Sequence, residues 1–178
     1  MAAALPTRAL AAGASGLRSV LTDLLPALAI GLGQVAIMVA VLLCGLDMKP
    51  VYPVAMAAFI YLTTVAFLAL QQMFIIVFGT AAGRVVSLVL LMLQLSSSGG
   101  TYPVETTPGF FQALHPFMPA TYEVSGLREL MTGGIDSRLW ISVAFLAALA
   151  IASVAVSAFC AGRQRVFSSK WLHPELEM

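Results

Sequence analysis

SSSGGTYPVETTPGFFQALHPFMP, residues 96–119, interrupts a chain that otherwise consists largely of long apolar runs. The stretch holds four of the chain's nine prolines, together with the pair Gly99-Gly100. Glycine lets the backbone leave a helix through positive φ values. Pro103 and Pro108 push the residues before them away from the helical region. We therefore expect a helix to end just before the two glycines and the chain to turn there.

Two short helices are predicted beyond this turn. Pro108 suits the first position of a helix, which would run through GFFQALH, residues 109–115. Thr121 is placed to cap a second helix over residues 122–131, which Gly133 would end. The stretch thus predicts a compact, broken segment in place of one continuous helix.

The composition is that of a membrane protein. Hydrophobic residues make up 60% of the chain and charged residues only 10%, far from the balance of a soluble domain. A helix needs about 20 apolar residues to cross a hydrocarbon core of roughly 30 Å. The uncharged runs predict an all-α integral membrane protein with four spans, at residues 24–46, 54–78, 80–98 and 139–162.

The basic residues predict the orientation, since lysine and arginine collect in cytoplasmic loops. Four spans place both termini on one side of the plasma membrane. Six basic residues fall on that side and three on the other, namely Lys49, Arg128 and Arg138. Residues 1–20 and 163–178 are therefore predicted to be cytoplasmic, and residues 99–134 to lie on the outer side.

Residues 99–119 are too few to span the membrane and too apolar to remain free in water. Irregular backbone at membrane depth is tolerated only when it packs against protein or lines a wet cavity. Aromatic side chains such as Phe111 and Tyr122 suit the membrane boundary. We therefore predict a re-entrant or interfacial hairpin at residues 99–119, followed by a short outer helix.

QLSSSGGTYPVETTPGFFQALHPFMPATYEVSGLREL, residues 94–130, closely resembles the signature region of the YhgE/Pip family within the ABC-2 type transporter superfamily. In that superfamily short re-entrant helices join the last two membrane helices on the outer side, so the resemblance implies the same hairpin. It also implies an ABC-2-like transmembrane domain over residues 21–162. The signature falls on Ser97, Ser98, Gly99, Gly100, Pro103, Glu105, Pro108, Phe111, His115, Pro116, Pro119, Tyr122, Arg128 and Glu129.

The same resemblance implies that the chain corresponds to one part of a larger membrane unit. ABC-2 domains usually have six membrane helices, and YhgE/Pip proteins carry a large extracellular domain after the first, whereas four spans are predicted here. The chain therefore resembles a C-terminal membrane half. Either it is completed by another membrane subunit in a homo- or hetero-oligomer, or it is a fragment of a longer protein with no activity of its own.

The sequence contains no nucleotide-binding motif. A P-loop needs GxxxxGK followed by Ser or Thr, but Lys49 follows Met48 and Lys170 follows Ser169. Transport driven by ATP would need a separate nucleotide-binding ATPase, and we predict no cofactor in this chain. A net charge of +1 is also too small for a nucleic-acid-binding surface.

Five ionisable residues cluster in the predicted outer segment: Glu105, His115, Glu123, Arg128 and Glu129. A His with nearby carboxylates could bind a metal or move protons. The cluster has no tight ligand spacing such as HExxH, so we favour a structural role. In that interpretation Glu123 or Glu129 pairs with Arg128 at the surface for about 0.5 kcal/mol. No catalytic residue or metal site is predicted, and the chain is not expected to be an enzyme.

Four glutamines lie within the predicted spans: Gln34, Gln71, Gln72 and Gln94. Polar groups inside a membrane usually face protein or a wet cavity. They could line a substrate path between two membrane halves, or they could form hydrogen bonds between helices. We favour helix association.

Two functions from different classes remain. In the first, the chain is a permease-type subunit of an ABC-2/YhgE-Pip transporter or exporter, with a path for an amphipathic or envelope-bound solute. In the second, it anchors a cell-surface or secretion-accessory assembly in the membrane, as a phage-infection protein would. The missing extracellular domain counts against the second, so the first is favoured.

Overall fold

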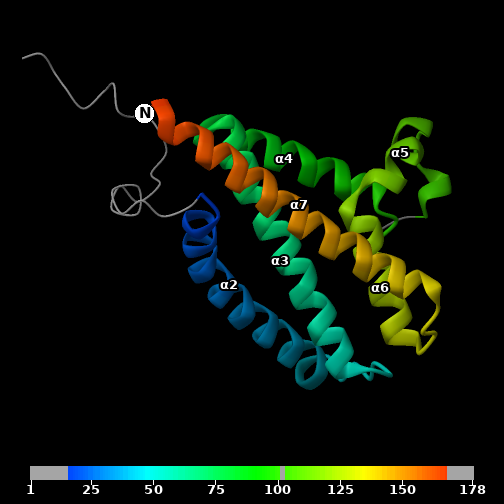
Figure 1. Cartoon of the computed structure of the whole chain (residues 1–178). Coiled ribbons are helices and arrows are strands. Elements are labelled where there is room, and N and C mark those ends of the chain that lie inside the picture. The colour runs from blue at the N-terminus through cyan, green and yellow to red at the C-terminus, as the bar shows by residue number, and fades with distance from the viewer. Residues whose placement is uncertain (1–15, 101–102, 168–178) are drawn as a thin grey trace, which may run out of the picture.

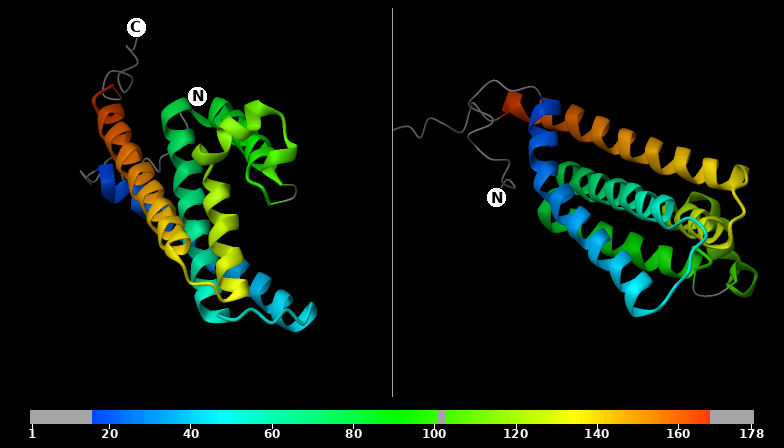
Figure 2. Two further views of the ribbon diagram at one scale, coloured as in Figure 1. Left: turned by 90° about the vertical axis from the view of Figure 1, so that its right-hand side faces the viewer. Right: turned by 90° about the horizontal axis from the view of Figure 1, so that it is seen from below.

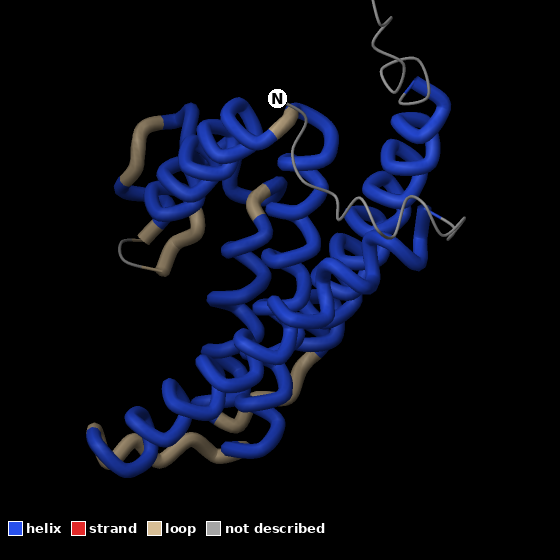
Figure 3. Tube along the Cα trace, turned by 90° about the vertical axis from the view of Figure 1, so that its left-hand side faces the viewer, coloured by secondary structure: helices blue, strands red, loops and turns tan. Residues whose placement is uncertain are grey.

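The computed structural model describes residues 16–100 and 103–167, and most of the predicted terminal segments lie outside these ranges. Its α-helices are α2 (Gly16–Ala40), α3 (Pro53–Phe78), α4 (Thr80–Ser97), α5 (Gly109–Leu114), α6 (Pro119–Thr132) and α7 (Ser137–Phe167). The shorter elements are the π-helical η1 (Val41–Gly45) and the 3-10 turns η2 (Val104–Thr106) and η3 (His115–Phe117). The described residues contain no strand (Figure 3), so the all-α prediction is confirmed.

Four helical stretches are long and apolar enough to cross a membrane: Gly16–Gly45, Pro53–Phe78, Thr80–Ser97 and Ser137–Gly162. The last three begin and end close to the predicted bounds. The first begins at Gly16 instead of near residue 24, because α2 continues past Asp23. Gly16 lies tightly against α7, where a Cβ would be 2.6 Å from the carbonyl oxygen of Ala158. The charges in the sequence therefore predicted where the first apolar run begins, but not where helix α2 begins.

Helix α3 lies at the centre of the bundle and contacts α2, α4, α6 and α7 (Figure 1). Its buried side chains include Met56 and Phe59, which form the core together with Leu130 of α6 and Leu146 of α7. Helix α2 begins beside the end of α7 and diverges from it along its length (Figure 2). The core is therefore built around α3.

A single residue joins α3 to α4. Gly79 has φ 83°, a value that glycine adopts without the penalty a Cβ would bring. One turn later the two helices approach so closely that a Cβ on Gly83 would lie 2.7 Å from the Phe74 carbonyl oxygen and 2.8 Å from the Ile75 Cα. The two helices therefore form one tightly closed pair.

The two short helices differ in detail from their predicted bounds. Pro108 is the N-cap of α5 instead of its first residue. Helix α6 begins at Pro119, because Met118 is extended and the proline takes the first helical position. The prediction that Thr121 caps this helix was therefore wrong, since Thr121 lies inside the first turn. The predicted end is confirmed at Gly133, which has φ 86°.

Candidate functional site

The last turn of α4 positions the start of the 99–134 segment. Ser97 is fully buried and donates its hydroxyl hydrogen to the carbonyl of Leu93 at 2.8 Å. The backbone N–H of Ser98 still makes a helical bond, to the carbonyl of Gln94 at 2.9 Å. Gly99 then leaves the helix with φ 71°, as predicted, and the Ser98 hydroxyl accepts the N–H of Gly100 at 3.4 Å. Of the two glycines, Gly99 makes the positive-φ turn.

His115 ties the far end of this segment back to α4. Its Nδ1 lies 2.5 Å from the carbonyl oxygen of Ser97, although the two residues are 18 positions apart in the chain. A carbonyl can only accept, so Nδ1 carries a hydrogen. Thr121 donates its hydroxyl hydrogen to the backbone carbonyl of His115 at 2.6 Å. His115 therefore joins α4, the hairpin and the first turn of α6 through hydrogen bonds.

Gln112 holds the exposed loop of the hairpin closed. Its Nε2 donates to the backbone carbonyls of Thr107 at 2.8 Å and Glu105 at 3.3 Å. The hydroxyl of Thr106 donates to the carbonyl of Pro103 at 2.7 Å. Glu105 is exposed and contributes its backbone to this network. The sequence did not single out Gln112, since nothing in its spacing shows which carbonyls it meets.

Helix α6 sits tightly against α3 and α7. The ring of Tyr122 stacks on Phe145 of α7, with 3.8 Å between ring centroids, and its hydroxyl donates to the carbonyl of Pro116 at 2.9 Å. A Cβ on Gly126 would overlap the ring of Phe59 in α3. A glycine inside a helical pattern often marks a close approach, so the sequence offered a signal at Gly126 that we did not use.

The predicted surface ion pair is absent, and this prediction was wrong. Arg128 instead donates to the carbonyl of Gly99 at 2.8 Å, which fastens α6 to the start of the segment. Glu129 accepts the backbone N–H of Asp136 at 2.9 Å. Glu123 is half-buried in α6. Both expected partners of Arg128 are thus placed elsewhere.

The structure does not gather the ionisable side chains of this segment into one centre. Within the described ranges, no three His, Cys, Asp or Glu side chains are placed to hold a metal ion. His115 bonds to backbone, while Glu105 and Glu129 occupy separate parts of the segment. What the arrangement does is mechanical: backbone carbonyls at Ser97 and Gly99 fix the hairpin to the end of α4.

The four glutamines separate into two kinds. Gln72 donates from Nε2 to the carbonyl of Val20 in α2 at 3.1 Å, a bond between helices of the kind favoured above. Gln94 is buried at the end of α4, with 4% of its surface exposed. Gln34 and Gln71 instead lie exposed on the surface of the bundle. The glutamines therefore do not line one common path within this chain.

Comparison with known proteins identifies the family of this chain. A family model for the ABC-2 type transporter matches residues 7–132. The chain belongs to this family. The resemblance carried by residues 94–130 is therefore confirmed, and the broken segment after α4 belongs to an ABC-2 membrane domain.

One curated relative of this ABC-2 domain is the uncharacterized protein YhgE of Bacillus subtilis (strain 168). The two are 33% identical over 128 residues, which cover 72% of this chain but 16% of YhgE. The chain thus spans a small part of the length of that relative. No solved structure matches this chain.

Proposed function

We propose that this ABC-2 chain is a permease-type subunit of a transporter or exporter in the cell membrane and that a separate ATPase drives it. Family membership and the four apolar helices support a role in transport. We further propose that the termini are cytoplasmic and that the 99–134 segment enters the membrane again from the outer side. The basic residues support this orientation, with six on the side of the termini and three on the other.

The position of α6 along α3 carries the re-entrant part of the proposal. Gly126 lies against Phe59, and Gly133, at the end of α6, lies beside Val51, just before α3 begins. The two helices therefore run antiparallel. Counting seven residues back along α6 from Gly126, and seven forward along α3 from Phe59, places Pro119 beside Ala66, roughly 20 Å from the first residue of α3. That depth lies inside a hydrocarbon core of about 30 Å, so the segment supports an outer half-span in place of a surface loop.

The exposed glutamines support a second membrane subunit. Gln34 and Gln71 would face lipid if the four helices worked alone, and a polar side chain inside a membrane usually faces protein or water. We propose that another membrane chain, the same or different, covers these positions.

Photocrosslinking from two ends of the bundle tests the function. A photoreactive residue replaces Leu17, which is 48% exposed near the start of α2, or Phe117, which is 75% exposed in the hairpin. Both are introduced in the full chain in living cells, and mass spectrometry identifies the captured proteins. We expect a nucleotide-binding ATPase in the adduct from position 17 and none from position 117.

Two other outcomes would contradict the proposal, one for the orientation and one for the permease role. An ATPase captured from position 117 alone would reverse the orientation. Capture of envelope proteins without an ATPase, from position 17 and from further positions at the same end, would replace the permease with the membrane anchor.

A further inference from the structure

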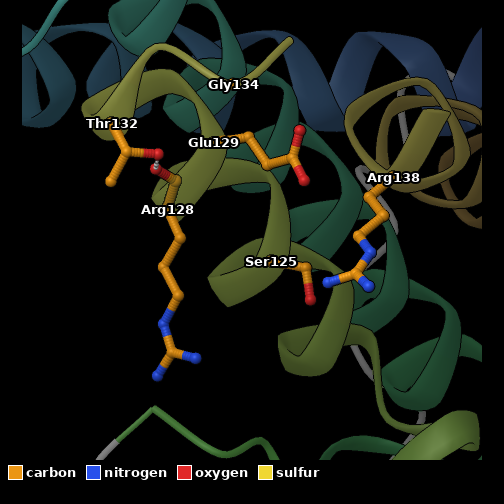
Figure 4. A pocket seen from close by; sticks show the side chains of 6 residues that line it. All are labelled: Ser125, Arg128, Glu129, Thr132, Gly134 and Arg138. Carbon is orange, nitrogen blue, oxygen red and sulfur yellow. Dashed lines mark hydrogen bonds between the residues drawn. The ribbon is translucent and has the colours of Figure 1, made fainter. Parts of the chain in front are cut away.

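A small polar cavity lies between the end of α6 and the start of α7, and the function proposed above does not use it. Its volume is about 210 Å³. Its lining residues are Ser125, Arg128, Glu129, Thr132, Gly134 and Arg138 (Figure 4). They come from the C-terminal half of α6, the turn that follows it and the first turn of α7. The sequence pattern pointed to Arg128 and Glu129 but not to the cavity, because it is the turn before α7 that brings Arg138 near them.

The cavity presents opposite charges that do not neutralise one another. Glu129 and Arg138 lie on different walls, and the part of the chain that the structure describes forms no ion pair between them. Glu129 uses Oε2 to accept the N–H of Asp136, which leaves Oε1 available. Arg128 points away from both, toward the carbonyl of Gly99 (Figure 4). A carboxylate, a guanidinium and the hydroxyl of Ser125 therefore remain for a ligand.

The cavity lies at one end of the candidate membrane spans. Helix α7 begins at Ser137, at the edge of a candidate span, and the end of α6 lies beside Val51, just before the span of α3. Trp140 is 66% exposed in the first turn of α7, and Tyr52 is 39% exposed just before α3. Exposed indole and phenol side chains at the ends of spans are typical of the membrane–water boundary.

We infer that this cavity binds the headgroup of a phosphoethanolamine lipid, with the phosphate at Arg138 and the ammonium at Glu129. A guanidinium matches two phosphate oxygens with parallel N–H donors, and the Ser125 hydroxyl donates beside it. A primary ammonium donates hydrogen bonds to a carboxylate. A cavity smaller than the roughly 300–1,000 Å³ of drug-sized sites suits such a small group.

The same chemistry separates this headgroup from other common ones. A choline headgroup carries the same charges, but its quaternary nitrogen has no N–H to donate to Glu129. A glycerol headgroup offers a phosphate for Arg138 and no cation for Glu129. A soluble phosphoethanolamine zwitterion would fit equally well, but the position of the cavity at the membrane boundary favours the lipid.

Lipid retention by the full chain tests the inference. The protein is reconstituted in bilayers with equal amounts of phosphatidylethanolamine, phosphatidylcholine and phosphatidylglycerol, then extracted in detergent, and native mass spectrometry counts the lipids that remain bound. We expect enrichment of phosphatidylethanolamine, and Arg138→Gln should lower its retention about tenfold, as expected for loss of a charge-assisted bidentate contact. Arg84→Gln, which removes an exposed arginine near the start of α4, is the matched control and should retain the lipid.

Two further variants separate binding from folding. Glu129→Gln keeps an oxygen to accept the N–H of Asp136 but removes the charge, so it should abolish the preference for phosphatidylethanolamine over phosphatidylcholine. Arg138→Lys keeps a cation without the guanidinium fork and should retain an intermediate amount. Size-exclusion profiles identical to that of the unaltered protein establish that all variants are folded.

Two results would overturn the inference. One is equal retention of phosphatidylethanolamine and phosphatidylcholine by the unaltered protein. The other is the same loss of lipid in Arg138→Gln and Arg84→Gln. Calorimetry with soluble O-phosphoethanolamine and delipidated protein distinguishes the sources: binding as tight as that of the lipid would reassign the cavity to a free solute.

Discussion

The close approach of α3 and α4 makes Gly83→Ala the most informative single substitution. The added Cβ would lie 2.7 Å from the Phe74 carbonyl oxygen, and 2.8 and 2.9 Å from the Cα and N of Ile75. All three atoms belong to backbone, so no side chain can rotate away. Gly33→Ala is the matched control, since a Cβ at that position of α2 meets nothing within 4 Å.

The magnitude follows from two opposing effects. Carbon atoms in ordinary contact are about 3.5 Å or more apart, so α3 and α4 must separate by several tenths of an ångström. Overpacking of this kind costs about 1–3 kcal/mol, whereas alanine favours a helix over glycine by up to about 1 kcal/mol. Gly33→Ala carries only the favourable effect. The free energies of unfolding of the two variants should therefore differ by roughly 2 kcal/mol, with Gly83→Ala the less stable.

Unfolding in mixed micelles by titration with sodium dodecyl sulfate, followed by circular dichroism, measures this difference. Both variants need the same detergent and lipid, because bound lipid also stabilises the folded state. If Gly83→Ala proves as stable as Gly33→Ala or more stable, the two helices are not in tight contact at this point.

Two further predictions concern the 99–134 segment. His115→Ala removes the donor to the carbonyl at the end of α4 and should lower the free energy of unfolding by about 1–2 kcal/mol. His115→Asn places an amide nitrogen near the position of Nδ1 and should recover much of the stability that His115→Ala loses, as measured by thermal unfolding. An equal loss of stability in the two variants would exclude a role for Nδ1. Glu105→Cys, in a Cys44→Ala/Cys160→Ala background, should react with an impermeant thiol reagent on intact cells. Labelling only after the cells are opened would reverse the proposed orientation.

The features that the sequence predicted well depend on local steric rules. Gly99 leaves α4 with a positive φ and Gly133 ends α6 in the left-handed region, because a residue with a Cβ is disfavoured there. The long uncharged runs predicted four spans because hydropathy alone decides which helices can cross a membrane. These rules act within a few residues, so one sequence is enough to apply them.

The contacts that fix the segment could not be predicted in the same way. Arg128 was expected to bind a neighbouring carboxylate but reaches the carbonyl of Gly99, 29 residues away in the chain. Thr121 was expected to cap α6 but donates to the carbonyl of His115, because Pro119 already begins the helix. Each choice depends on how helices pack in three dimensions, and nothing in the local sequence records it.

Because Gly79 alone links α3 to α4, a movement of the turn between them would be passed along α4 to the other end of the helix. Helix α4 is 18 residues long, about 27 Å, and no loop interrupts it between Gly79 and its last turn. At that last turn the carbonyl of Ser97 meets the ring of His115. A partner that displaced the α3–α4 turn along the membrane normal would therefore displace the hairpin by nearly the same distance. A protein that never approaches the far side could in this way change the shape of the surface there.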